Sequence, residues 1–154
     1  MIDYAKEQGV VLLHENEKDI YGDTFLRCAD LMKELYCDNF KAVFDPANFV
    51  QSGQDTVEAY DVLKDYIEYM HIKDAMAEDS RVVPSGYGDG NVEYVLKNLF
   101  DGGYDGFLSL EPHLGSFEGL ADLELDDKME KLPKSGVGTY MIAYNALCDI
   151  LEKI

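Results

Sequence analysis

Cysteine and basic residues are scarce in this sequence. Its three cysteines, Cys28, Cys37 and Cys148, are too few and too scattered for a disulfide framework, and they lack the spacing of a metal site. Lysine and arginine number 13 against 31 aspartates and glutamates, which gives a formal net charge of −18. Because proteins neutralise the phosphate backbone of nucleic acids with Lys and Arg, this balance disfavours nucleic acid as a partner.

Long apolar runs are also missing. No stretch approaches the roughly 20 apolar residues that a membrane helix needs, and residues 1–7 show no basic segment leading into an apolar one, so no secretory signal is expected. Together with Cys28 and Cys148, which fall in helical patterns typical of reduced, partly buried thiols, this favours a cytoplasmic location. With 47% apolar residues over 154 positions, the sequence predicts one globular domain spanning residues 1–154.

Short apolar runs and helical patterns alternate along the chain. Four strands are expected near residues 10–14, 41–45, 67–72 and 106–111. Apolar residues at offsets of three and four predict helices over 24–36, 54–66, 91–100 and from about 138 to the end. Strands that alternate with helices in this way indicate an α/β fold with a parallel sheet and right-handed crossovers.

A potential metal ligand stands at the end of every predicted strand, namely Glu15, Asp45, His71 and Glu111. Taken singly, each is more often a solvated loop residue or a structural histidine. In a parallel sheet, however, all four strand ends lie on one rim, where such folds place their sites. Three carboxylates and one imidazole suit a hard divalent ion, with Mn²⁺ first and Mg²⁺, Co²⁺ or Zn²⁺ as alternatives.

Five segments resemble, in order and spacing, the sugar phosphate isomerase/epimerase family of the xylose isomerase-like TIM barrels. They are 13–17 (LHENE), 44–49 (FDPANF), 71–74 (HIKD), 86–90 (GYGDG) and 107–113 (FLSLEPH). The resemblance covers nearly the whole chain. It implies the C-terminal half of a (β/α)8 barrel, four βα units, with the metal held by Glu15, Asp45, His71 and Glu111.

The activity that this resemblance implies is metal-dependent isomerisation or epimerisation of a sugar or sugar phosphate. Glu15 and Glu111 would be the acid/base pair, moving a proton through an enediolate stabilised by the metal. Asn48, Lys73 and His113 are expected to contact the substrate, although Lys73 could be an exposed strand-end lysine and His113 a plain loop residue. The glycines of 86–90 either form a simple turn or bring backbone N–H groups to an anion.

Two other functions are compatible with parts of this pattern. Endonuclease IV-like repair enzymes of the same superfamily use additional zinc-binding histidines. This chain has Asn48 and residues 82–85 (VVPS) at two of those places, which disfavours the nuclease function. A non-catalytic metal- or sugar-binding half-barrel stays open, because four strands cannot close a TIM barrel. The unclosed half would be a truncated piece, would pair with a second copy, or would complete a split enzyme; self-association is favoured because two of its strands are too apolar to face water.

Overall fold

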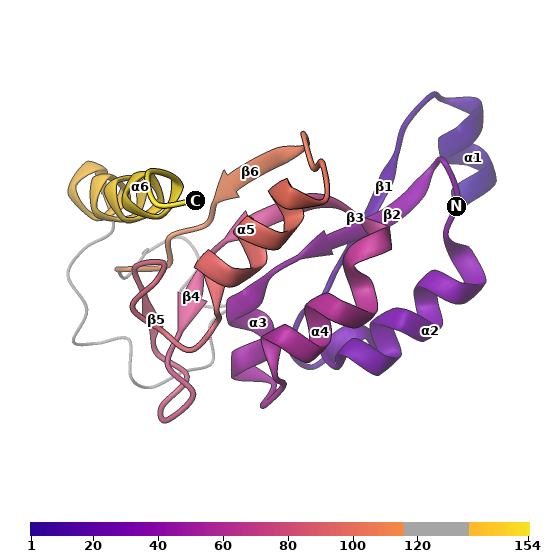
Figure 1. Cartoon of the computed structure of the whole chain (residues 1–154). Helices are drawn as coiled ribbons and strands as arrows, with labels where there is room; N and C mark the ends of the chain where they lie inside the picture. Colours follow the sequence, from indigo (N-terminus) through magenta and orange to yellow (C-terminus); the bar gives the residue numbers. More distant parts are fainter. Residues whose placement is uncertain (116–135) are drawn as a thin grey trace.

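A four-stranded parallel sheet forms the centre of the computed structural model, which describes residues 1–115 and 136–154 (Figure 1). The strands run in the order β1, β2, β3, β6, and they are β1 (Leu12–Glu15), β2 (Phe40–Phe44), β3 (Ile67–Ile72) and β6 (Phe107–Leu110). Neighbouring strands are parallel throughout. The α/β class and the parallel sheet predicted from the sequence are therefore confirmed.

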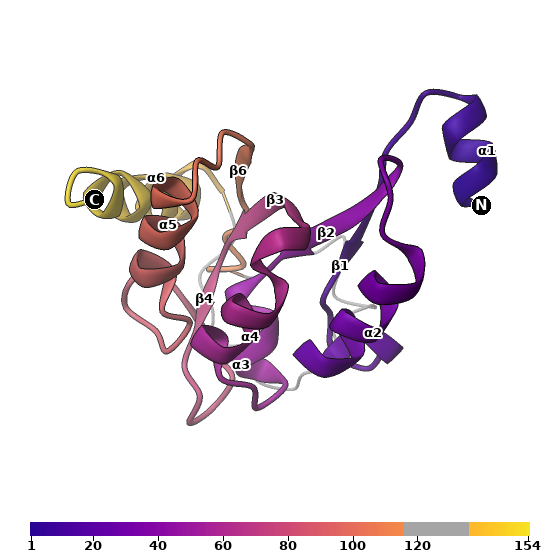
Figure 2. The same ribbon diagram turned by 45° about the vertical axis from the view of Figure 1, so that its right-hand side comes forward.

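The helices α2 to α5 cover one face of this sheet, as Figures 1 and 2 both show. The helices are α1 (Ile2–Glu7), α2 (Phe25–Leu35), α3 (Pro46–Gln51), α4 (Thr56–Leu63), α5 (Val92–Asp101) and α6 (Val137–Leu151). Two single 3-10 turns, Tyr21–Asp23 and Lys64–Tyr66, precede α2 and β3. None of the described helices is both long enough and apolar enough to cross a membrane.

Side-chain alternation along the strands separates the apolar core from the polar site. Phe44, Met70 and Ile72 are at most 1% exposed and belong to the core that the helices share with the sheet. Because successive strand residues point to opposite faces, Asp45 and His71 point away from that core. The same period of two therefore builds the core and aims the candidate ligands at the other face.

A helix and a short strand pair were not predicted from the sequence. Helix α3 begins directly after β2, with Asp45 as its N-cap and Pro46 at its first position. Proline is favoured there because its fixed φ suits a helix and its missing N–H is not needed. A short antiparallel pair, β4 (Asp74–Ala75) with β5 (Val82–Val83), follows β3. Both elements lie beside the rim that carries the site.

Candidate metal centre

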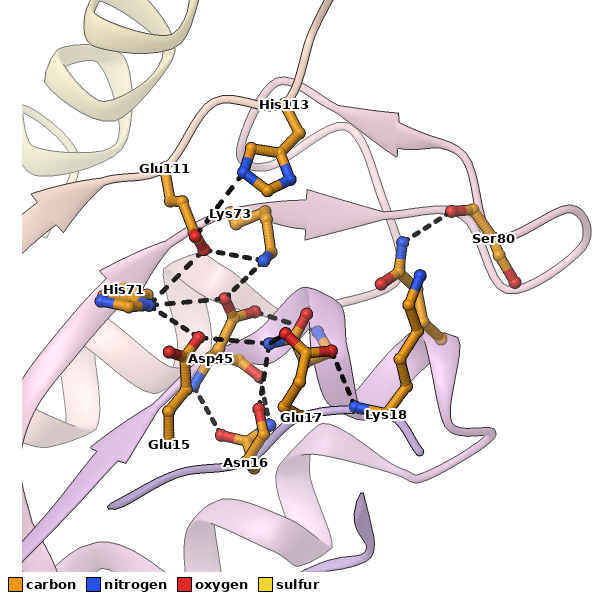
Figure 3. Close-up of polar contacts among 12 residues, drawn as sticks. Glu15, Asn16, Glu17, Lys18, Asp45, His71, Lys73, Ser80, Glu111 and His113 are labelled. Carbon is orange, nitrogen blue, oxygen red and sulfur yellow. Dashed lines mark hydrogen bonds and ion pairs between the residues drawn. The ribbon is translucent and has the colours of Figure 1, made fainter. Parts of the chain in front are cut away.

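The four predicted ligands lie together at the carboxyl ends of the strands (Figure 3). One donor atom from each of Glu15, Asp45, His71 and Glu111 lies within 4.8 Å of the others. Metal–oxygen bonds of Mg²⁺ are about 2.1 Å long, so ligands on opposite sides of one ion are roughly 4 Å apart. The donors are thus close enough to share a single divalent ion.

His71 stands between the carboxylates of this cluster. Its Nδ1 atom lies 2.9 Å from Glu15 Oε1, 3.5 Å from Glu111 Oε2 and 3.8 Å from Asp45 Oδ2. The carboxylates of Asp45 and Glu15 raise the pKa of His71 to about 10 and outweigh its burial. In the metal-free protein the imidazole is therefore a cation at neutral pH, and its charge offsets part of the acidic cluster.

Asp45 is the most constrained of the predicted ligands, because its carboxyl group is fully buried. Its Oδ1 atom accepts a hydrogen bond from the backbone N–H of Asn48 at 2.9 Å, which caps α3. Its Oδ2 atom is buried and has no hydrogen-bond partner among the described residues. Lys73 Nζ lies 3.0 Å from Oδ2 in an ion pair. This ion pair offsets part of the cost of burying the oxygen, and a bound divalent cation would offset more of it.

Lys73 balances part of the charge of the cluster. Its side chain is 3% exposed, and Nζ also lies 2.7 Å from Glu111 Oε2. Burial opposes the charged form, but the carboxylates of Asp45 and Glu111 raise the pKa of Lys73, which stays protonated. With a neutral imidazole, the three carboxylates and this ammonium leave two negative charges in excess, and a divalent ion would neutralise them. The residues present therefore fit such an ion.

The two remaining predicted substrate contacts border the same cluster. Asn48 is buried, and its Nδ2 atom lies 2.9 Å from the Asn16 carbonyl oxygen, 3.2 Å from Glu15 Oε1 and 3.3 Å from Glu17 Oε2. His113 is half exposed, with Nε2 3.6 Å from Glu111 Oε1. The Asn48 amide is thus occupied by contacts within the protein, whereas the His113 ring is accessible to solvent.

The glycines of residues 86–90 surround a protein carboxylate. Buried Asp74 accepts backbone N–H bonds of 2.8–3.0 Å from Ala75, Gly86, Gly88 and Gly90. Burial raises the pKa of Asp74 despite these hydrogen bonds. A Cβ on Gly90 would lie 2.6 Å from the Asp74 carboxylate. The anion that these N–H groups receive is therefore Asp74, so the loop is anchored by the residue that follows Lys73.

Asn16 is the residue of the site that sequence reasoning did not single out. It is 2% exposed, and its side-chain amide exchanges two hydrogen bonds with the backbone of Asp45. Its place directly after Glu15 was the one available signal. A polar residue there reads as part of a solvated loop until its partner on the next strand is known.

Comparison with known proteins gives related folds of about twice this length. The chain superimposes on a D-tagatose 3-epimerase-like protein (TM-score 0.70, 19% identity, 98% of this chain and 50% of that one). It superimposes similarly on D-allulose 3-epimerase from Methylomonas sp. (TM-score 0.70, 17% identity, 99% and 52%). A xylose isomerase-like TIM barrel protein from Mycobacterium smegmatis, solved in complex with magnesium, gives a TM-score of 0.66 at 20% identity (97% and 46%).

These likenesses establish the fold, and the chain spans about half the length of the structures that it matches. No curated protein sequence matches it significantly. Residues 1–134 match the sequence profile of the xylose isomerase-like TIM barrels. Since that match covers most of the chain, the protein belongs to the xylose isomerase-like TIM barrel family, of whose barrel it supplies four βα units.

Proposed function

We propose that this chain carries the metal centre of a divalent-metal-dependent sugar isomerase or epimerase. The observation that carries the proposal is the convergence of Glu15, Asp45, His71 and Glu111 at the carboxyl ends of four adjacent parallel strands. TIM-barrel enzymes place their active sites at that end of the barrel. The names of two similar structures, a D-tagatose 3-epimerase-like protein and a D-allulose 3-epimerase, support ketoses as the substrate class.

Mn²⁺ is the ion that we favour for this site, with Mg²⁺, Co²⁺ and Zn²⁺ as alternatives. Three carboxylates and one imidazole form a mostly oxygen donor set, which suits hard divalent ions better than thiolate-binding ones. The ligands would be Glu15, Asp45, His71 and Glu111. When bound, the ion would polarise a sugar carbonyl and acidify the neighbouring C–H bond.

Glu15 and Glu111 are our candidates for the acid/base pair. They come from β1 and β6, the two outer strands of the sheet, with His71 Nδ1 between their carboxylates. Carboxylates on opposite sides of a bound sugar can remove a proton from one face and return one from the other, which inverts a carbon centre. If the proton returns to the adjacent carbon, the same pair isomerises the sugar.

Glu111 is held in its ionised form, the form in which a carboxylate can accept a proton. Burial disfavours its ionised form, but the Lys73 ammonium outweighs burial, so the pKa of Glu111 is lowered. The Lys73 contact involves Oε2, whereas Oε1 faces His113. Lys73 thereby holds Oε2 in place, while Oε1 points toward the half-exposed His113 ring. His113 is the substrate contact that we favour, with Asn48 and Lys73 acting closer to the ligands.

Additional strands are needed to enclose the site, and we propose that a second copy of this chain supplies them. Leu13 and Phe107 lie on the face opposite the helices and are 39% and 75% exposed. Among the residues that the structure describes, strands β1 and β6 are the edges of the sheet, and edge strands present backbone groups that can pair with another chain. The N-terminal half of a longer barrel would meet the same need.

A test that does not presuppose the product is solvent deuterium exchange. The protein would be stripped with a chelator, reloaded with Mn²⁺, and incubated in D₂O with a panel of ketoses and aldoses. We expect wild type to bind about one Mn²⁺ per chain and to incorporate carbon-bound deuterium by NMR. Glu111→Gln should lower the exchange rate by about 10² to 10⁴. Glu68→Gln, on the neighbouring strand but paired with Lys41, is the matched control and should exchange normally.

Metal binding can be measured in parallel with stability. A ligand specific for the folded state stabilises it by about 2.7 kcal/mol at a hundredfold excess over its Kd. Mn²⁺ should therefore raise the thermal midpoint of wild type, and Asp45→Ala should abolish the rise. Bound metal without deuterium exchange from any sugar would contradict the enzyme and leave a metal-binding module. Absence of bound metal would contradict the site itself.

A further inference from the structure

Asn16 follows a proposed metal ligand but is itself buried, and its side chain contacts the backbone of another ligand. We infer that Asn16 is a positioning residue whose amide fixes the backbone of Asp45 and so aims the Asp45 carboxylate at the metal. This inference rests on the proposed metal centre.

The Asn16 side-chain amide adds one more pair of hydrogen bonds beyond the backbone pairing of β1 and β2. Backbone pairing of these strands ends at Glu15 and Val43. Beyond that point, the backbone N–H of Asp45 donates to Asn16 Oδ1 and Asn16 Nδ2 donates to the Asp45 carbonyl oxygen, both at 2.9 Å (Figure 3). A side-chain amide has the same donor and acceptor as a peptide group, so Asn16 pairs with Asp45 as a strand backbone would.

Asn48 closes this contact into a ring. Its Nδ2 atom donates to the Asn16 carbonyl oxygen, and its backbone N–H donates to Asp45 Oδ1, both at 2.9 Å. The same Nδ2 atom lies 3.2 Å from Glu15 Oε1. Asn16, Asp45 and Asn48 thus connect the ends of β1 and β2, and the connection reaches two of the proposed ligands.

The metal-facing oxygen of Asp45 depends on this backbone anchor. Among the described residues Oδ2 has no hydrogen bond, and its close contact is the ion pair with Lys73 at 3.0 Å. Lys73 is itself shared with Glu111 and cannot define the position of Oδ2 alone. Metal–ligand distances tolerate errors of only about 0.2 Å. Freeing the Asp45 backbone should therefore weaken metal binding, and outer contacts of this kind typically contribute 10- to 100-fold in affinity.

The test compares Asn16→Ala and Asn16→Asp with Asn39→Ala. Asn16→Asp keeps the acceptor for the Asp45 N–H but loses the donor to the Asp45 carbonyl. Asn39 is a matched control, because its Nδ2 atom donates to Val10 O at 2.8 Å and joins the same two chain segments at the opposite end of the strands. The readouts are the Mn²⁺ Kd by calorimetry, the visible spectrum of the Co²⁺-loaded protein, and folding by circular dichroism.

We expect Asn16→Ala to raise the Mn²⁺ Kd at least tenfold and to change the Co²⁺ ligand-field bands, while Asn39→Ala leaves both unchanged. A merely structural role would lower the thermal midpoint without altering the Co²⁺ spectrum of the folded fraction. A folded Asn16→Ala protein whose Kd is within twofold of wild type and whose spectrum is unchanged would overturn the inference. If Asn16→Ala does not fold, the same criteria apply to Asn16→Asp.

A metal-free readout separates this inference from the proposed function. Amide hydrogen exchange at Asp45, measured relative to Met70 in the central strand β3, should accelerate at least tenfold in Asn16→Ala, which removes the acceptor of the Asp45 N–H. Unchanged relative exchange would overturn the positioning role even if wild type binds metal. If wild type binds no Mn²⁺, the metal centre fails, whereas accelerated exchange would still support the Asn16 anchor.

Discussion

His71 Nδ1 lies 2.9 Å from Glu15 Oε1, so two of the four proposed metal ligands contact each other. The carboxylates of Asp45 and Glu15 raise the pKa of His71 to about 10. A metal ion takes the lone pair of a neutral imidazole nitrogen, so the Nδ1 proton must leave when the ion binds at that atom. The contact between His71 and Glu15 thus couples metal binding to pH.

Mn²⁺ affinity should rise about tenfold per pH unit between pH 6.5 and 8.5, because one proton is displaced well below the pKa of His71. The stability of the metal-free protein should change in the opposite direction and fall as pH rises. Protonated His71 contributes stability because its pKa is higher in the folded protein than in the unfolded chain. This contribution is fully present below the unfolded pKa of 6.5 and is lost as pH rises through the folded pKa of about 10. Calorimetry in two buffers of different ionisation enthalpy would count the released proton.

His14→Gln provides the control for proton release. His14 lies on β1 beside Glu15, but burial lowers its pKa, so it has no proton to lose in this pH range. Release should persist in His14→Gln and disappear in His71→Gln. Affinity independent of pH between 6.5 and 8.5 would contradict the assignment of His71 as a ligand.

Lys73→Met should destabilise the metal-free protein more than the metal-loaded one. Removing one partner of a buried ion pair typically costs about 3–5 kcal/mol, and here it takes the ammonium away from Asp45 and Glu111 and leaves them only the more distant His71 imidazolium. A divalent ion would restore much of that charge balance, so Mn²⁺ should raise the thermal midpoint of Lys73→Met more than that of wild type.

Lys41→Met removes a comparable contact outside the site. Lys41 Nζ lies 2.7 Å from Glu68 Oε2 in a partly exposed pair, which contributes at most about 1 kcal/mol. Its midpoint should respond to Mn²⁺ as wild type does. An equal response of Lys73→Met and Lys41→Met would show that Lys73 does not balance the charge of the metal ligands.

The convergence of the four proposed ligands could be predicted from the sequence because strand geometry fixes their positions. Asp45 and His71 end apolar runs, and parallel strands bring such ends to one rim. Contacts between side chains and distant backbone could not be predicted in this way. Asn16 and Asp74 read as loop residues until Asp45 and the loop 86–90 are placed beside them.

Gly88→Ala should destabilise the loop that Asp74 anchors. A Cβ at Gly88 would lie 2.6 Å from the Ala75 carbonyl oxygen and closer still to the Asp74 carboxylate. Overpacking of this kind costs about 1–3 kcal/mol, which chemical denaturation would measure. Gly138→Ala, in α6 with open space around it, should be neutral or stabilising by up to about 1 kcal/mol. Equal stability of the two variants would contradict the close packing of the loop.

Phe107→Glu should reduce self-association. Phe107 is 75% exposed on the edge strand β6 and stacks on Tyr69, with ring centroids 5.9 Å apart, on the face opposite the helices. Exposed apolar residues on an open edge favour pairing with another chain. Light scattering of wild type should give at least twice the chain mass of 17.4 kDa, and Phe107→Glu should shift it toward one chain.

Tyr87→Glu tests whether any exposed aromatic residue would behave in this way. Tyr87 is 72% exposed but lies in the loop 86–90, outside the strands of the sheet. Its substitution should leave the oligomeric mass unchanged. A monodisperse wild-type species of 17.4 kDa would contradict self-association. The second strand set would then have to come from a different polypeptide segment, because the open edges of β1 and β6 still need partners to close a barrel.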